Sequence, residues 1–414
     1  MSKKPAQVAI VGAGPAGLFA AERLAAAGLG VTVYDRMASP GRKFLLAGRG
    51  GLNLTHSEPR EAFLARYGEA RAWLQPVIDA FPPPALQAWA ETLGEPTFVG
   101  SSGRVFPRSF KASPLLRAWL RRLDGLGVKL VTRHRLVGWG PNNALIFETA
   151  DGRKTVRADA VILALGGASW PRMGSDGAWV DLLGAKDVPV APLKPANMGV
   201  QIGWSPDFAA RFAGQPLKGI AVAAGGPRTL GEAMITATGL EGSAIYAVSG
   251  RLRDGLATGR QTLTIDLRPS LSAEAIAGKL EGARAKDSLS TILRKRLAMA
   301  PQALGLLREG TGGPLPQSAL GIARRIKAVA LPVDSVSGIE RAISSAGGVM
   351  AEAIADNGAL KALPHVFVAG EMLDWEAPTG GYLLQASFAT GEAAAQAVAA
   401  SLKVRLADIA PSDW

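Results

Sequence analysis

The start of the chain carries the hydrophobic pattern of a strand, a helix and a second strand. Residues 7–11 form a short apolar run that predicts a buried strand, and the alanine-rich residues 18–27 predict a helix. Gly28 is expected to end this helix, because glycine adopts the left-handed conformation at a helix C-terminus without steric cost. The β-branched run at residues 31–34 predicts a second strand, which completes a βαβ unit.

Helical and strand patterns alternate over the next part of the chain. Helical spacing at residues 61–93 is interrupted by prolines at positions 82–84, which predicts an inserted pair of helices. Residues 113–125 predict a further helix, with Ser113 as its N-cap and Pro114 at its first position. Three strands of a meander are expected after it, at residues 129–132, 144–149 and 155–157. The apolar run at residues 160–165 predicts a central strand that is buried on both faces.

The pattern changes after residue 191, which predicts an inserted second domain. The short strands and the basic helical tract expected in the insert lie near residues 199–202, 220–223, 263–266 and 273–327. A strand at residues 366–369 and a helix at residues 391–402 then return the chain to an α/β pattern. We therefore expect a discontinuous first domain, residues 1–191 and 331–414, and an inserted β/α domain, residues 192–330.

A glycine motif joins the first predicted strand to the first helix. Gly12, Gly14 and Gly17 have the GxGxxG spacing, which allows a tight turn, close approach of a pyrophosphate, and close packing of helix on strand. The helix N-terminus then presents unpaired N–H groups and its positive dipole end to the phosphates. Asp35 follows Gly17 by 18 residues, where a carboxylate accepts hydrogen bonds from ribose hydroxyls. The motif predicts dinucleotide binding, and the charge of Asp35 disfavours a 2′-phosphate.

Composition narrows the possible chemistry. The 414 residues include no cysteine, which excludes disulfides, thiolate metal sites, iron–sulfur clusters and cysteine nucleophiles. The three histidines, His56, His134 and His365, are far apart in sequence, so we expect no metal site. Redox chemistry in this chain therefore requires a bound cofactor.

Charge and hydropathy bear on partners and location. The formal charge of +12 favours a polyanionic partner or phosphate-bearing ligands, although a basic solvated surface explains it equally well. Glu22 and Arg23 interrupt the apolar N-terminal stretch, which argues against a signal peptide. No stretch reaches the roughly 18 uncharged apolar residues that a membrane span needs. We expect a cytoplasmic protein with no membrane partner.

The segment at residues 366–391 bears on the choice between FAD and NAD. FAD proteins of this architecture return the chain to the nucleotide domain with a strand, a Gly–acid pair near the ribityl chain, and a helix N-terminus aimed at the isoalloxazine. Gly370 and Glu371 match the pair, and residues 380–382 would open the helix. Its N–H groups can stabilise negative charge on the reduced flavin. The alternative interpretation is an ordinary strand, loop and helix.

Several blocks of the sequence resemble one family, and together they run nearly end to end. The blocks are residues 12–17, 41–56, 103–113, 158–177, 238–245, 344–349 and 366–391. They resemble the BaiN/YhiN-like bacterial flavoproteins, which are NAD(P)/FAD-dependent oxidoreductases. The resemblance implies an α/β fold with a Rossmann-like FAD-binding domain built from both chain ends. It also implies an inserted β-barrel-like plus helical domain on the substrate side.

The resemblance also implies a set of cofactor residues. It places residues 41–43 near the flavin diphosphate and residues 48–53 close to the flavin ring. Arg42 and Lys43 are donors suited to phosphate, although solvated surface charges are the alternative interpretation. The residues expected to bind the cofactor are Gly12, Gly14, Pro15, Ala16, Gly17, Asp35, Arg36, Gly41, Arg42, Lys43, Gly50, Asn53, Leu136, Ala164, Gly166, Gly370, Glu371, Gly380, Gly381, Tyr382 and Leu383.

The catalytic residues are not identified by any motif. Where the family is expected to have GRCNxTN, this chain has GGLNLTH, so Leu52 replaces the cysteine and His56 replaces the final asparagine. If the cysteine donates a proton in relatives, Leu52 cannot, and His56 is a candidate acid or a polar loop residue. Arg108 and Lys111, next to two phenylalanines, suit an anionic or planar substrate unless the aromatics belong to the core.

These features predict an FAD-dependent oxidoreductase that passes hydride from flavin N5 to a C=C bond of an enone or a uracil. The insert has no second GxGxxG motif, so NAD(P)H is expected to visit the flavin transiently. The substrate would be a small molecule or an RNA uridine, and the oligomeric state is left open. One alternative is a flavin oxidase or monooxygenase. Another is an RNA- or ribosome-associated protein with structural FAD, in which one basic face of the insert contains Arg294, Lys295, Arg296, Arg324, Arg325 and Lys327.

Overall fold

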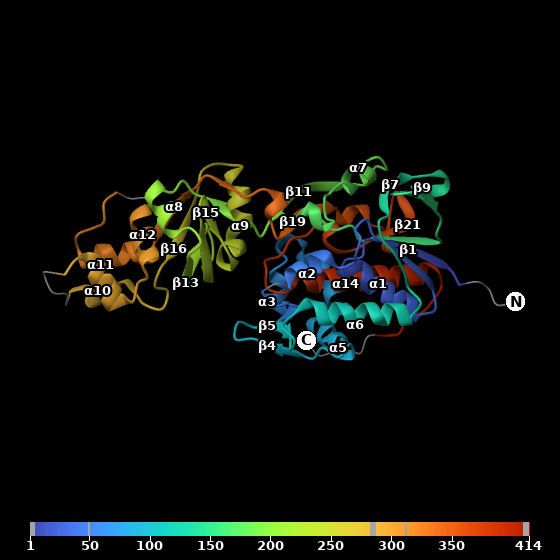
Figure 1. The fold of residues 1–414 in the computed structure, drawn as a ribbon, viewed down its shortest axis with the longest axis horizontal. Coiled ribbons are helices and arrows are strands. Elements are labelled where there is room, and N and C mark those ends of the chain that lie inside the picture. Colours follow the sequence, from blue (N-terminus) through green and yellow to red (C-terminus); the bar gives the residue numbers. More distant parts are fainter. Residues whose placement is uncertain (1–4, 49, 282–286, 311–312, 409–413) are drawn as a thin grey trace. The chain divides into compact units, whose positions relative to one another are not determined.

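The computed structural model describes residues 5–48, 50–281, 287–310, 313–408 and 414. The chain folds into two compact units: unit 1 is Met1–Lys194 with Ser344–Trp414, and unit 2 is Pro195–Ile343 (Figure 1). A domain limit between residues 330 and 331, as expected from the sequence, would cut strand β17 (Val329–Val333). That strand pairs along its length with β16 (Gln261–Asp266) inside unit 2.

Unit 1 contains both ends of the chain. Its strands are β1 (Gln7–Val11), β2 (Gly30–Tyr34), β3 (Thr55–His56), β4 (Thr97–Val99), β5 (Arg104–Pro107), β6 (Lys129–Val131), β7 (Arg135–Trp139), β8 (Leu145–Thr149), β9 (Gly152–Val156), β10 (Ala160–Leu163), β11 (Val190–Ala196, ending in unit 2), β19 (Ser344–Val349), β20 (Ala359–Leu360) and β21 (Leu363–Val368). Its α-helices are α1 (Pro15–Ala26), α2 (Arg42–Ala47), α3 (Arg60–Ala65), α4 (Arg71–Ala80), α5 (Pro83–Thr92), α6 (Ala112–Gly125), α7 (Trp179–Gly184) and α14 (Tyr382–Ser401).

A six-stranded sheet organises unit 1, in the order β20-β21-β10-β1-β2-β6. All its neighbouring strands pair in parallel except the edge strand β20, which is antiparallel to β21. At the centre, Ile10 lies opposite Ile162 on one side and Val33 on the other, and all three are fully buried. Continuous apolar strands suit this position because helices cover both faces of a parallel sheet.

Three local expectations for unit 1 were wrong. Strand β6, predicted as part of the meander, pairs in parallel with β2, and the meander consists of β7, β8 and β9. The pair of helices expected at residues 61–93 is replaced by α3, α4 and α5. Helix α6 has Lys111 at its N-cap and no side-chain cap bond, because Ser113 already lies inside the first turn.

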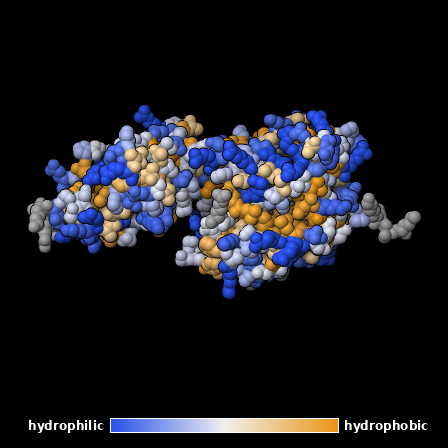
Figure 2. All heavy atoms as spheres, in the orientation of Figure 1, coloured by the Kyte–Doolittle hydropathy of each residue, from blue (hydrophilic) through white to orange (hydrophobic). Residues whose placement is uncertain are grey.

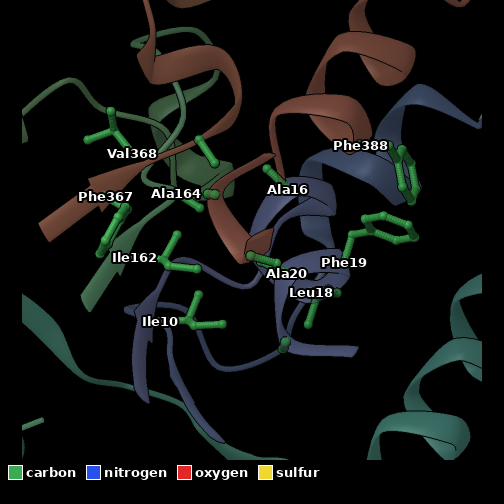
Figure 3. Packing of buried hydrophobic residues seen from close by; sticks show 14 of the residues in the cluster. Ile10, Ala16, Leu18, Phe19, Ala20, Ile162, Ala164, Phe367, Val368 and Phe388 are labelled. Atoms are coloured by element: carbon green, nitrogen blue, oxygen red, sulfur yellow. The ribbon is translucent and has the colours of Figure 1, made fainter. Parts of the chain in front are cut away.

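The two chain ends share one core. In Figure 3, Phe19 of α1 and Phe388 of α14 lie next to each other, with ring centroids 5.3 Å apart in an edge-to-face arrangement. The helices approach closely, since a Cβ added to Gly391 would lie 2.6 Å from the carbonyl oxygen of Ala16. The last helix of the chain is therefore packed directly on the first.

Unit 2 combines a curled antiparallel sheet with a helical region. Its seven strands follow the order β17-β16-β13-β14-β15-β12-β18. The two edge strands are consecutive in the chain and separated by Asp334 alone, so the sheet is nearly closed, as the barrel-like insert was expected to be. The remaining elements are β12 (Val200–Gln201), β13 (Pro216–Ala223), β14 (Thr229–Thr236), β15 (Gly239–Glu241), β18 (Ser335–Val336), α8 (Pro206–Phe212), α9 (Ser243–Leu256), α10 (Ala273–Glu281), α11 (Leu289–Leu297), α12 (Pro301–Glu309) and α13 (Ala319–Lys327). Among the described residues, no helix has the length and apolar character needed to cross a bilayer.

Replacing Gly391 with alanine tests the close contact between α1 and α14. The new methyl group would press on the main chain of Ala16, so we expect the free energy of unfolding to fall by about 1–3 kcal/mol. The matched control is Gly125→Ala in α6, where an added Cβ meets no atom within 4 Å. Urea denaturation of both variants checks the prediction. Equal stability of the two would contradict it.

Candidate dinucleotide site

A pocket in unit 1 lies at the carboxyl ends of β1, β2 and β10, where ligands bind in parallel α/β sheets. On the face of unit 1 shown in Figure 2, apolar residues gather over α1, α2 and α14. Segments from both chain ends contribute to the pocket wall. The expected cofactor residues that line it are Gly12, Gly14, Pro15, Ala16, Asp35, Arg36, Gly41, Arg42, Lys43, Leu136, Ala164, Gly166, Gly370 and Glu371.

The three motif glycines have different surroundings. Gly12 has a φ of +111°, and a Cβ there would overlap the carbonyl of Ala164 in the segment after β10. Gly17 does not line the pocket, and a Cβ there would overlap the carbonyl of Gly12. A Cβ on Gly14 would meet no atom within 4 Å. Gly12 and Gly17 therefore allow close packing, while Gly14 leaves open space on the pocket wall.

Helix α1 and Asp35 provide the polar groups on this side. The N-cap residue of α1 is Gly14 and no side chain caps the helix, so N–H groups of the first turn remain for a ligand. Asp35 Oδ2 accepts a hydrogen bond from the Ala13 N–H at 2.7 Å, and Oδ1 accepts one from the Met37 N–H at 2.7 Å. Burial raises the pKa of Asp35, and these two N–H groups oppose the shift. The two hydrogen bonds thus hold the carboxylate at the pocket, and its remaining lone pairs can accept hydrogen bonds from a ligand.

Lys43 and Glu371 join the two chain ends at the pocket. Lys43 Nζ lies 2.7 Å from Glu371 Oε2 and donates to Ser169 Oγ at 2.6 Å. The Ser345 N–H donates to Glu371 Oε1 at 2.9 Å. Both charged side chains are largely buried, so the pair fixes the Gly–acid segment against α2.

Two polar atoms of pocket-lining residues are buried without a hydrogen-bond partner among the described residues. They are Arg42 Nε and Ser175 Oγ. An unpaired buried donor costs about 1–3 kcal/mol, so a ligand that offers oxygen atoms would satisfy both. These atoms, the open space at Gly14 and the carboxylate of Asp35 fit the diphosphate and ribose of a dinucleotide. The expected place of Arg42 near the flavin diphosphate stays a prediction.

The other expected cofactor residues lie outside this pocket lining. Gly381, the N-cap of α14, packs on the main chain of Thr55. The Tyr382 hydroxyl donates to Glu58 Oε1 at 2.7 Å, and Asn53 Oδ1 is buried with no partner among the described residues. A place for them beside the flavin ring stays a prediction. The expected residues absent from the lining are Gly17, Gly50, Asn53, Gly380, Gly381, Tyr382 and Leu383.

His56 has both ring nitrogens engaged. Nδ1 accepts a hydrogen bond from the Glu58 N–H at 3.1 Å, which leaves the proton on Nε2, 3.1 Å from the carbonyl oxygen of Ser102. The ring stacks on Tyr382 with centroids 5.3 Å apart. Burial is the main cause of a lowered pKa for His56. A role as proton donor would require the contact with Ser102 to break.

Arg108 and Lys111 are exposed on the surface of unit 1, next to three aromatic rings. Phe106 lies 4.9 Å from Phe110 and 5.8 Å from Phe98, measured between ring centroids. Phe98 and Phe110 are 39% and 44% exposed, so these rings form a surface group and not a core. Neither cation lines the dinucleotide pocket.

The basic residues of unit 2 do not form one free face. Lys327 Nζ contacts Asp266 Oδ2 at 2.7 Å and donates to two main-chain carbonyls. Arg296 and Arg325 donate to the carbonyls of Lys279 and Gly310. These three cations are thus engaged in contacts within unit 2. The other residues of the predicted face, Arg294, Lys295 and Arg324, are exposed.

Sequence reasoning missed one wall of the pocket. Residues 173–176, in the loop after β10, line the site, as do His134 and Arg135 at the start of β7. The loop belongs to one of the blocks that carry the family resemblance, but its residues follow no spacing rule for a ligand. Of the described residues, no three His, Asp or Glu side chains are grouped to hold a metal ion.

The fold and the pocket define a Rossmann-type dinucleotide-binding protein. The family model described as "HI0933-like protein Rossmann domain" matches residues 6–397, so the chain belongs to the HI0933-like family. The expected α/β class, with a Rossmann-type FAD-binding domain and a barrel-like plus helical insert, is confirmed.

Curated relatives and solved structures resemble most of the chain. A 3-dehydro-bile acid delta(4,6)-reductase from Clostridium scindens is 28% identical, over 95% of this chain and 99% of the relative. A ribosomal RNA dihydrouridine synthase from Haemophilus influenzae is 24% identical, over 70% of this chain and 71% of the relative. The open form of a flavocytochrome c3 fumarate reductase has a TM-score of 0.51 at 15% identity, over 96% of this chain and 78% of that one. The structural likeness supports the fold.

Exchanging His56 for asparagine tests its half-buried, neutral state. A lowered pKa in the folded protein means that, as the pH falls through about 6.5, the unfolded chain takes up a proton before the folded one does. Stability contributed by His56 is therefore present above this pH and lost below it. We expect the stability loss between pH 7.5 and 5.5 to be smaller in His56→Asn than in wild type, measured by urea denaturation. An identical pH dependence would argue against this.

Proposed function

We propose that this protein is an FAD-dependent oxidoreductase that takes hydride from NAD(P)H and delivers it to a C=C bond conjugated with a carbonyl group. The observation that carries the proposal is the pocket shared by both chain ends. It combines a glycine turn, an uncapped helix N-terminus, a carboxylate at the end of β2, and unsatisfied buried donors. When bound, FAD supplies hydride transfer at N5.

Different residues of this chain would bind different parts of FAD. Asp35 would accept hydrogen bonds from the ribose hydroxyls, because its bond from the Ala13 N–H fixes the orientation of the carboxylate. The first turn of α1 and the Arg42 guanidinium would bind the diphosphate. Glu371, paired with Lys43, would meet the ribityl chain. Gly381 and Tyr382, at the start of α14, would direct main-chain N–H groups toward N1 and O2 of the ring.

The proton that completes reduction of the C=C bond would come from outside the GGLNLTH segment, residues 50–56. Leu52 is fully buried and has no proton to give, and both nitrogens of His56 are engaged. Gly51 belongs to the loop that the resemblance places beside the flavin ring. The Phe110 ring packs against Gly51 so closely that a Cβ there would overlap it. Lys111 follows Phe110 and is exposed, so we propose Lys111 as the donor candidate on this side.

A planar apolar enone is the substrate class that we propose. The relative named as a bile-acid reductase covers nearly the whole chain. The exposed Phe98 and Phe110, together with the partly buried Phe106, offer ring surfaces to such a molecule. Uracil in RNA is the second candidate. It is favoured by the relative named as a ribosomal RNA dihydrouridine synthase and by the exposed cations Arg294, Lys295 and Arg324.

The Gly14→Ala variant tests where FAD binds. The added methyl group meets no protein atom within 4 Å and the φ of −87° at Gly14 suits alanine, so the fold should be retained. The methyl group would occupy the space assigned to the diphosphate, and we expect FAD affinity to fall about 10-fold or more. Fluorescence titration of the apoprotein with FAD measures this. Unchanged affinity would place the diphosphate elsewhere.

The reaction is tested on the FAD-loaded protein without oxygen. We expect NADH or NADPH to bleach the flavin absorbance near 450 nm and a 3-oxo-4-ene steroid to restore it, since hydride passes through the flavin. RNA that contains uridine is the parallel acceptor. Fast recovery with air alone would identify an oxidase. Failure of both nicotinamides to bleach the flavin would favour structural FAD.

A further inference from the structure

One wall of the dinucleotide pocket is a short segment that neither the GxGxxG motif nor the C-terminal block accounts for. Residues 170–176, here called the clasp, include the single-turn helix at Pro171–Met173 and lead toward α7. Met173, Gly174, Ser175 and Asp176 of the clasp line the pocket together with Gly12–Ala16 and Arg42 from other elements. The clasp therefore faces the space that we assign to the dinucleotide.

The clasp is fastened to the end of β2. Arg36 Nη2 donates to the Pro171 carbonyl at 3.1 Å, and Arg36 Nη1 forms an ion pair with Asp176. The two charged side chains are 29% and 32% exposed, so water reaches the pair. A Cβ on Gly174 would lie 2.9 Å from Met37 Cγ, which shows how closely the clasp rests on the residue after Arg36.

The clasp begins in an unfavourable backbone conformation. Trp170 has a φ of +59°, in the left-handed region that favours glycine, and this costs roughly 1–2 kcal/mol for other residues. Such a conformation persists where neighbouring contacts hold it. The Arg36 contacts with Pro171 and Asp176 contribute to this hold, as does the contact of Arg42 Nη2 with Met173 Sδ at 3.8 Å.

Ser175 faces the pocket with an unused hydroxyl. The residue is 5% exposed, and its Oγ has no hydrogen-bond partner among the described residues. Gly166, another pocket residue, has a φ of +72°, and a Cβ there would lie 3.0 Å from Ser175 Oγ. Arg42 Nε lines the same pocket and is also without a partner in the described part of the chain. A buried serine hydroxyl that no protein atom satisfies points to a ligand with an acceptor oxygen.

We propose that the clasp closes over the bound dinucleotide. Ser175 donates a hydrogen bond to an oxygen atom of the cofactor, and the Arg36–Asp176 ion pair holds the clasp shut. Cofactor release then requires this pair to break. The proposal rests on FAD binding, as proposed above, and it adds Ser175 and Asp176 to the residues that determine how long FAD stays bound.

The test measures the rate at which the FAD-loaded protein releases its flavin. Flavin fluorescence is followed after dilution, and the dissociation constant is measured by titration. Ser175→Ala removes one hydrogen bond to the cofactor, and we expect about 10-fold weaker binding and correspondingly faster release. Asp176→Asn removes the ion pair, and we expect about 3–5-fold faster release. Asp176→Glu keeps the charge and should restore slow release.

A matched control exists on the same unit. Arg60 and Asp79 form an ion pair with 30% and 35% exposed side chains, close to the values of the clasp pair. Neither residue lines the pocket. Asp79→Asn should therefore leave FAD release unchanged. In a double-mutant cycle, Arg36→Ala is combined with Asp176→Asn. The double variant should release FAD more slowly than the product of the two single effects predicts, because both substitutions remove the same ion pair.

The outcomes separate this proposal from the one on which it rests. If wild type binds FAD but both Ser175→Ala and Asp176→Asn release it at the wild-type rate, the clasp proposal is wrong and FAD binding stands. If effects appear equally in Asp79→Asn, they reflect general destabilisation and the proposal fails. If wild type binds no FAD, the proposed function is wrong and the clasp proposal falls with it. Circular dichroism of each variant confirms that it folds.

Discussion

Close main-chain contact between the start of the chain and two segments distant from it in sequence is the constraint on which unit 1 depends. The turn after β1 touches the segment after β10 at Gly12, and α1 touches α14 at Gly391. A side chain at either position would separate the layers, because the neighbouring atoms are main-chain atoms that cannot rotate away. These contacts place an uncapped helix N-terminus at the edge of the sheet. The pocket is a consequence of this packing.

Polar groups at the pocket follow from the same packing. Segments that meet only in three dimensions bring Lys43 to Glu371, and the pair is satisfied within the protein. Arg42 Nε and Ser175 Oγ, in contrast, are buried and unsatisfied. Elsewhere among the described residues, buried charges such as Asp266 are paired, here with Lys327. Two other buried donors without a partner in the described part of the chain, Trp119 Nε1 and Trp139 Nε1, belong to residues outside the pocket lining. Arg42 Nε and Ser175 Oγ differ from them because a ligand in the pocket can complete their hydrogen bonds.

The sequence predicted what is encoded locally and missed what depends on distant partners. The βαβ unit with Gly12 and Asp35 followed from spacing alone, since one turn and one helix determine it. Strand β6 was misassigned because its three residues carry no sign of their partner, β2. Lys327 was expected on a free basic face, yet it pairs with Asp266 on a strand 61 residues earlier in the chain. The residues of the clasp were missed for the same reason, because Arg36 and Asp176 meet only in the folded chain.

The two halves of the proposed site differ in how firmly the protein determines them. The groups assigned to the nucleotide and diphosphate lie on strand ends and helix starts, which a rigid sheet holds in place. The region assigned to the ring has a buried Leu52 and an engaged His56, while its exposed groups are Phe110 and Lys111. The acceptor and the proton route proposed above depend on exposed side chains, which can change without disturbing the core, so proteins that share a fold can act on different substrates.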